Sequence, residues 1–160
     1  MILESGNGVE FAVDDIDYNL VSKYKWSAYQ TRGLWYVVAY QREIRRPLYL
    51  HRLITSAETG MDVDHIDHDG LNNTRANLRV CEHRLNLANQ RKQSDRSSIY
   101  KGVCFVKNRA HQRKPWMAQI KASGKHRNLG YYESEAGAAM AYNKAAQESF
   151  GEFALLNEVT

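Results

Sequence analysis

The chain has little of what marks a secreted, disulfide-stabilised or membrane-spanning protein. It holds two cysteines in 160 residues, Cys81 and Cys104, and their spacing suits reduced thiols better than a disulfide framework or a four-ligand zinc site. No uninterrupted apolar run approaches the roughly 18 residues of a membrane span. The first residues, MILESGNGVEF, lack the basic and then apolar layout of a signal peptide. We therefore expect a cytoplasmic protein without a membrane partner.

Acidic residues are nearly absent from one long stretch. Residues 91–132 contain eleven lysines and arginines against one acid, Asp95, so this stretch carries +10 while the rest of the chain carries −6. Aromatic residues are interleaved with the basic ones, for example at Tyr100 and Tyr131. A short basic run is usually a solvated surface, but so long a bias indicates a polyanionic partner, and we expect double-stranded DNA.

The N-terminal part of the chain predicts a small β-rich unit, residues 1–60. Alternating or apolar segments predict strands within 9–15, 25–30 and 34–41. A short helix is predicted over 48–57, directly after a proline, and a histidine beside its apolar stripe is expected to pack in the core.

The middle of the chain predicts a strand at 61–66, a polar loop, a strand at 77–81 and a helix at 82–93. We expect residues 1–93 to form one domain and residues 94–98, which are polar and lack periodicity, to form a linker.

The last part of the chain, residues 99–160, predicts a second domain. Strand-length segments occur at 99–106, 115–122 and 126–132. An amphipathic helix follows over 134–150, with Ser134 as its N-cap and a glycine at its end. The expected fold class is therefore α+β, with three antiparallel strands packed on one helix at the C-terminal end.

The densest group of candidate ligands is DHIDHDGLNN, residues 64–73. An EF-hand calcium loop needs oxygen ligands at positions 1, 3 and 5, glycine at 6 and a bidentate glutamate at 12. With Gly70 at position 6, Asp67 and Asp69 fit positions 3 and 5, but positions 1 and 12 hold a histidine and an alanine. The two strongest ligand positions fail, so the pattern does not favour calcium.

Two further interpretations concern the polar residues of this region. Five of them are interpreted as turn-forming residues: Asp67, His68, Asp69, Asn72 and Asn73. A weaker alternative is a structural zinc ion held by four side chains that lack compact ligand spacing: His65, His68, Cys81 and His83.

The order of Asp64 and His65, then Asn77 within NLR, then Asn86 on the following helix resembles the HNH motif of phage and intron-encoded endonucleases, the ββα-metal fold. The segment LHRLI, ahead of this motif, strengthens the resemblance, which covers about residues 48–90. It implies that the β-rich unit leads into a nuclease module that hydrolyses phosphodiester bonds of DNA.

The resemblance implies a role for each motif residue. His65, which titrates near neutral pH, would be the general base for the attacking water, and Asn77 would orient it. Asp64 and Asn86 would hold one divalent ion. Asp64 and His65 point to opposite sides of an ideal strand, so a bend or the strand's end must bring them to one site.

The third letter of the motif differs from its name, because Asn86 stands where many members have histidine. An oxygen ligand favours Mg²⁺ or Mn²⁺ over Zn²⁺. His83, one helical turn earlier, is the alternative ligand.

The C-terminal segments YKGV, WMAQIK and LGYY resemble the DNA-binding domain of plant ethylene-response factors, the AP-two type, over about residues 99–157. The resemblance implies a three-stranded sheet that enters the major groove. Cys104 stands where an arginine is usual, and Trp116 has core packing as an equal alternative. The residues expected to contact DNA are Lys101, Lys107, Arg109, Arg113, Trp116, Gln119, Lys121, Lys125 and Arg127.

These observations favour a metal-dependent DNA endonuclease of the homing type from a phage or mobile element, acting in the cytoplasm of a bacterial host. The alternative is a DNA-binding regulator that does not cleave and whose HNH-like segment is structural. We expect a monomer, with a dimer as the alternative.

Overall fold

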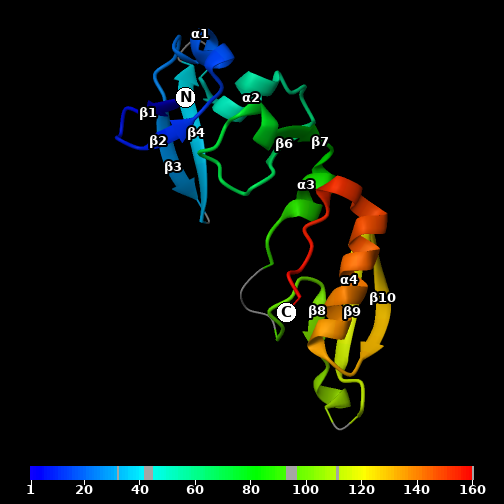
Figure 1. The fold of residues 1–160 in the computed structure, drawn as a ribbon. Helices are drawn as coiled ribbons and strands as arrows, with labels where there is room; N and C mark the ends of the chain where they lie inside the picture. The colour runs from blue at the N-terminus through cyan, green and yellow to red at the C-terminus, as the bar shows by residue number, and fades with distance from the viewer. Residues whose placement is uncertain (32, 42–44, 93–96, 111, 160) are drawn as a thin grey trace. The chain divides into compact units, whose positions relative to one another are not determined.

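The computed structural model describes residues 1–31, 33–41, 45–92, 97–110 and 112–159 (Figure 1). The chain divides into two compact units, Met1–His83 and Arg84–Thr160. Helix α3, His83–Asn89, spans this division. The linker expected at 94–98 lies largely outside the described residues. Among the helices of the described ranges, none is long and apolar enough to cross a bilayer.

Antiparallel strand pairs provide the β structure of the first unit. Strand β4 is the centre of a sheet with β3 and β5, while β1 pairs with β2 and β6 pairs with β7. The strands are β1 (Ile2–Glu4), β2 (Glu10–Ala12), β3 (Ser27–Thr31), β4 (Leu34–Gln41), β5 (Arg46–Tyr49), β6 (Asp62–His65) and β7 (Leu78–Cys81). The strands expected from alternation are present, and β1 and β5 were not predicted.

Short helices connect these strands: η1 (Asp15–Asp17), α1 (Tyr18–Val21), α2 (Leu50–Thr55) and η2 (Arg75–Asn77). The helix expected over 48–57 begins at Leu50, because the chain up to Tyr49 is still strand β5. Pro47 lies in this edge strand opposite Tyr40. An edge strand tolerates a residue that has no backbone N–H to donate.

One hydrophobic core joins the N-terminal strands to the motif-bearing segments. It consists of Phe11, Val13, Val21, Trp26, Ala28, Val37, Ala39, Leu50, Ile54, Val63 and Leu78. Val63 comes from β6 and Leu78 from β7, so the strand pair that carries the HNH-like motif shares its core with the first forty residues. Removal of those residues would therefore expose apolar surface beneath the motif.

The second unit is the expected sheet covered by one helix, with strand order β10-β9-β8 (Figure 1). Its elements are β8 (Val103–Phe105), η3 (Lys107–Arg109), β9 (Trp116–Ala122), β10 (Lys125–Tyr132), α4 (Glu135–Phe150) and η4 (Gly151–Phe153). Small side chains of α4, such as Ala138 and Ala146, are fully buried and let the helix lie close to the sheet. Ser134 caps α4 by accepting a hydrogen bond from the Gly137 amide at 3.0 Å.

Gly102 is required by a close approach of this helix. Its φ is +75°, and a Cβ there would lie 1.9 Å from the ring of Tyr142 and 2.8 Å from the carbonyl oxygen of Gln119. Gly124 has a similar φ of +74°, but a Cβ there would meet nothing within 4 Å. The two glycines therefore share a backbone constraint and differ in their surroundings.

We expect Gly102→Ala to destabilise the second unit by roughly 2–4 kcal/mol, because it adds an overpacking cost to the cost of a positive φ. Gly124→Ala is the matched control and should cost about 1 kcal/mol, the backbone contribution alone. Amide hydrogen exchange along β9, the central strand, measures both effects. Equal destabilisation by the two substitutions would contradict the packing of Tyr142 on Gly102.

Candidate active site

Strands β6 and β7 place the two neighbouring motif residues in different surroundings. Asp64 lies directly opposite Arg79, and His65 lies opposite Leu78. The Asp64 side chain forms an ion pair with Arg79, whereas the His65 side chain meets Asn73. Alternation along a strand accounts for these separate contacts.

The Asp64 carboxylate is buried and ion-paired. It is 6% exposed, and its Oδ2 atom accepts hydrogen bonds from Nε and Nη2 of Arg79 at 2.8 and 2.7 Å. A buried carboxylate is costly without such a partner. Sequence analysis missed Arg79 as a site residue, although pairing the two predicted strands would have set opposite charges side by side.

His65 is held through Asn73, which is fully buried. The Asn73 side-chain nitrogen donates to the Gly70 carbonyl at 3.1 Å, so the amide oxygen faces His65 Nε2, 3.3 Å away. A carbonyl oxygen only accepts, so Nε2 carries the hydrogen and Nδ1 of the neutral ring carries the lone pair.

Burial lowers the pKa of His65, and this effect outweighs the hydrogen bond with Asn73 and the nearby carboxylates of Asp67, Asp64 and Asp69, which raise it. The neutral imidazole therefore predominates at neutral pH. A neutral imidazole is the form that can take a proton from water.

Asn77 closes the loop between β6 and β7. Its side-chain nitrogen donates to Asp67 Oδ1 and to the Asn72 carbonyl, both at 2.8 Å, and its oxygen accepts from the Asp67 amide at 3.1 Å. These bonds use both donors and the acceptor of the Asn77 amide, and they go to the loop. Asn77 would therefore orient His65 indirectly, by fixing the conformation of the loop.

The other polar loop residues form turns, in agreement with their interpretation. Asp67 accepts from the Asp69 amide at 2.8 Å, and Asp69 accepts from the Leu71 amide at 3.0 Å. Burial alone would raise the pKa of Asp67, but hydrogen bonds from Asp69, Asn72 and Asn77 lower it overall. Asn73 differs from these residues because its amide contacts the imidazole.

Residues near the N-terminus fix the position of this loop. The Ala12 amide donates to the Leu71 carbonyl, and the Asn73 amide donates to the Ala12 carbonyl, both at 2.8 Å. Gly70 lies so close to β4 that a Cβ there would be 1.8 Å from the Trp35 carbonyl oxygen. The loop is thus held by backbone contacts with β2 and β4.

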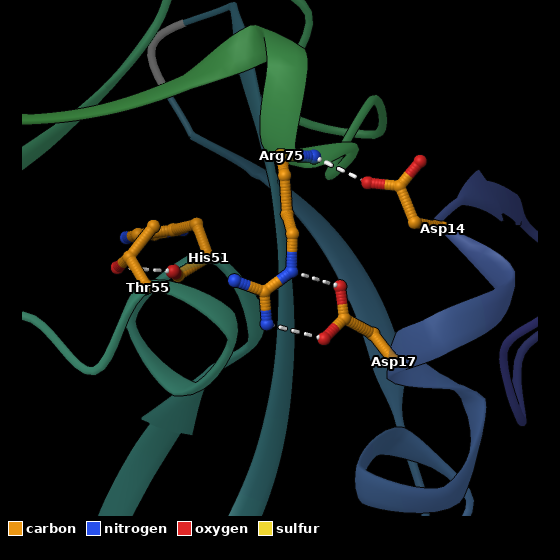
Figure 2. A network of polar contacts seen from close by, with 5 residues as sticks. All are labelled: Asp14, Asp17, His51, Thr55 and Arg75. Carbon is orange, nitrogen blue, oxygen red and sulfur yellow. Dashed lines mark hydrogen bonds and ion pairs between the residues drawn. The ribbon is translucent and has the colours of Figure 1, made fainter.

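An ion pair anchors the far end of the loop, as Figure 2 shows. Arg75 donates from Nε and Nη2 to the two oxygens of Asp17 at 2.9 and 2.6 Å, and its amide donates to Asp14 at 2.7 Å. Asp17 is 3% exposed. No local pattern in the sequence predicts this pair, because its members are 58 residues apart.

His51 packs in the core beside His65, as expected. Its ring centroid lies 5.3 Å from that of His65 and 5.5 Å from that of Tyr49. Its backbone carbonyl accepts from Thr55 Oγ1 at 2.8 Å (Figure 2). Burial, assisted by the nearby His65 and Arg52, lowers the pKa of His51 to about 3.

The predicted metal ligands are oxygen donors: a carboxylate at Asp64 and an amide at Asn86. This donor chemistry fits Mg²⁺ or Mn²⁺. Asn86 lies on α3, within the second unit. His83, the alternative ligand, has Nδ1 at 2.8 Å from an oxygen of Asp62. Across the described part of the chain, no three His, Cys, Asp or Glu side chains gather as a structural zinc site would require, which removes the zinc alternative there.

Lys101, Arg113 and Trp116, which were expected to contact DNA, have contacts within the second unit. The Lys101 ammonium donates to the carbonyls of Ala88 and Gln90, and burial lowers its pKa to about 8. Arg113 pairs with Glu133 at 2.8 Å. Trp116 packs against the core beneath α4.

The remaining predicted residues of the sheet lie on two faces. Gln119 and Lys121 are opposite Asn128 and His126 and alternate with residues buried against α4, so they lie on the open face. The Arg109 guanidinium lies 4.0 Å from the centre of the Tyr131 ring. Lys125 and Arg127 on β10 are opposite Ala122 and the buried Ile120, so they lie on the face that carries α4. Lys107 lies on η3, outside the sheet.

Comparison with known proteins gave two matches. Residues 48–88 match the HNH endonuclease family. The chain is 33% identical over 162 residues to an uncharacterized HNH endonuclease, L560, of Acanthamoeba polyphaga mimivirus, and the match covers 99% of this chain and 80% of that protein. No solved structure matches.

The buried His51 predicts a pH-dependent stability of the first unit. Its pKa is about 3 in the folded protein against 6.5 for an ordinary histidine. Between these values the unfolded chain binds a proton that the folded chain does not, so stability is complete above pH 6.5 and falls as the pH drops towards 3. His51→Phe should remove this dependence, by up to about 1.4 kcal/mol per pH unit.

Urea unfolding followed by the fluorescence of Trp26 and Trp35, in a Trp116→Phe background, measures this effect in the first unit. Carboxylates titrate in the same range, so the test is the difference between the parent and His51→Phe at each pH. A constant difference from pH 7 to pH 4 would contradict the low pKa.

Proposed function

Because the chain belongs to the HNH endonuclease family, we propose that it is a metal-dependent DNA endonuclease that hydrolyses phosphodiester bonds with His65 as the general base. The observation that carries this proposal is the contact of His65 Nε2 with the buried amide oxygen of Asn73. This contact supports an orientation of the imidazole in which Nδ1 of the neutral ring carries the lone pair.

The surroundings of His65 suit both halves of a proton transfer. Burial favours the neutral ring before the reaction, so that Nδ1 can accept a proton from the attacking water. The carboxylates of Asp67 and Asp69 favour the imidazolium that forms. The Asn73 oxygen accepts from the Nε2 hydrogen of both the neutral ring and the imidazolium, so the ring keeps the same orientation in both states.

We assign Asp64 and Asn86 as ligands of one Mg²⁺ or Mn²⁺ ion, on the basis of the motif. When bound, such an ion stabilises the negative charge that develops on the phosphate. The Asp64 carboxylate is held in place by Arg79. The bond between His83 and Asp62 supports Asn86 over His83 as the second ligand.

We assign DNA binding to the open face of the sheet in the second unit, in the manner of the ethylene-response-factor domain. The charge of +10 over residues 91–132 supports this assignment. Gln119 and Lys121 on β9 are positioned for base and phosphate contacts. Cys104, opposite Met117, lies on this same face, and its lack of charge suggests a different base preference from that of plant factors.

A DNA-binding regulator that does not cleave is the second candidate. The observation that favours it is the buried ion pair of Asp64, which already neutralises the carboxylate. The homing type, the phage or mobile-element origin and the bacterial cytoplasm remain part of the proposal, on resemblance alone.

His65→Ala should lower the rate of DNA cleavage by at least about 10²-fold, because it removes the proton acceptor. The dissociation constant for the same duplex should stay within about threefold, because phosphate contacts dominate affinity. Cleavage of a labelled duplex under single-turnover conditions, with binding measured in parallel, separates the two effects. His65→Gln, which keeps a polar side chain without a basic nitrogen, should behave as His65→Ala does. Parallel losses of binding and cleavage would mark His65 as structural.

Lys121→Gln should reduce the slope of log affinity against log salt by about 0.9, the contribution of one phosphate contact. Arg127→Gln is the matched control, because it removes the same charge from the face that carries α4. The control should leave the slope unchanged. The slopes are obtained by measuring DNA affinity across a series of salt concentrations. If Arg127→Gln changed the slope as much as Lys121→Gln does, the assignment of DNA binding to the open face of the sheet would be refuted.

A further inference from the structure

Arg79 neutralises Asp64 within the strand pair itself. The two residues are directly opposite each other on β6 and β7, and both guanidinium nitrogens converge on the Oδ2 atom of Asp64. The Arg79 side chain is 13% exposed. The guanidinium places a positive charge directly beside the carboxylate.

The neighbouring carboxylate on this face is paired as well. Asp62 lies two residues before Asp64, on the same side of β6, and one of its oxygens is 2.8 Å from His83 Nδ1. Arg79 balances the charge of the carboxylate that a cation at Asp64 would meet, whereas the contact of Asp62 with His83 is an ion pair only when the imidazole is protonated. This differs from a dense acidic site, in which surplus negative charge attracts the ion by itself.

We propose that Arg79 makes divalent metal binding at Asp64 depend on bound DNA. Without DNA, the guanidinium repels the ion and competes for the carboxylate oxygen, so the ion binds weakly. A DNA phosphate supplies negative charge that offsets the guanidinium, and it offers further oxygen ligands. The ion therefore binds the protein–DNA complex more tightly than it binds the free protein, and DNA binds the metal-bound protein more tightly than the metal-free protein. This inference rests on the proposed assignment of Asp64 as a metal ligand.

A purely structural role for Arg79 leads to the opposite expectation. If Arg79 only compensates a buried charge, its removal would let the Asp64 carboxylate move and would weaken metal binding. If Arg79 opposes the ion, its removal strengthens metal binding in the absence of DNA. The sign of the change in metal affinity therefore separates the two roles.

The test measures Mn²⁺ binding to the full chain by the electron paramagnetic resonance signal of free Mn²⁺, with and without a short duplex. The His65→Ala background keeps the DNA intact. We expect DNA to tighten Mn²⁺ binding at least about tenfold in this background. Adding Arg79→Met should tighten Mn²⁺ binding about fivefold or more without DNA and reduce the effect of DNA. Arg79→Lys, which keeps the charge, is the matched control and should retain most of the coupling.

Weaker or unchanged Mn²⁺ binding by Arg79→Met in the absence of DNA would overturn the inference. If Arg79→Met does not fold, Arg79→Gln takes its place. The coupling between Mn²⁺ and DNA can also be measured with Arg79 unchanged. By linkage, Mn²⁺ must tighten DNA binding by the same factor as DNA tightens Mn²⁺ binding, and the absence of coupling in both directions would also overturn the inference.

Asp64→Asn separates this inference from the proposed function. Loss of Mn²⁺ binding in Asp64→Asn, together with unchanged coupling in Arg79→Met, would leave the metal assignment standing and refute only the role of Arg79. Unchanged Mn²⁺ binding in Asp64→Asn would refute the metal assignment itself.

Discussion

The hydrogen bonds between Asp67 and Asn77 close the loop that joins β6 to β7, and the positions of His65 and Asn73 depend on that closure. The Asn77 amide binds both the backbone and the side chain of Asp67. Closure brings Asn73, eight residues beyond His65, back to the imidazole. A loop of this length without internal bonds would leave the histidine free to adopt several rotamers, with either ring nitrogen protonated.

The N-terminal strands belong to the same structural unit as the motif. The family match covers residues 48–88, yet backbone bonds from Ala12 and the close approach of Trp35 to Gly70 position the loop within that region. Asp17 supplies a buried carboxylate to Arg75 at the loop's other end. The catalytic geometry proposed for the motif therefore depends on residues outside it.

The sequence allowed prediction of features that local patterns encode. Alternation predicted β6 and β7, and small residues at helical spacing, with Ser134 before them, predicted α4. Asp64 and His65 were predicted as site residues because they are adjacent in the chain and begin the motif, and their roles stay predictions. Pairs such as Asp17 with Arg75 could not be predicted, because their contact depends on the folded path of the chain rather than on spacing. Lys101 was expected at DNA for its charge and its place in the YKGV segment, whereas its position at the carbonyls of Ala88 and Gln90 is a tertiary contact.

We propose that this chain cleaves DNA by a metal-dependent reaction at the β6–β7 site. The most direct measurement is the incubation of the purified chain with supercoiled plasmid in Mg²⁺, with EDTA in a parallel sample. We expect conversion of the plasmid to its open-circular or linear form in Mg²⁺, no conversion in excess EDTA, and recovery when Mg²⁺ is restored. An intact plasmid in both Mg²⁺ and Mn²⁺, or equal conversion in EDTA, would contradict it.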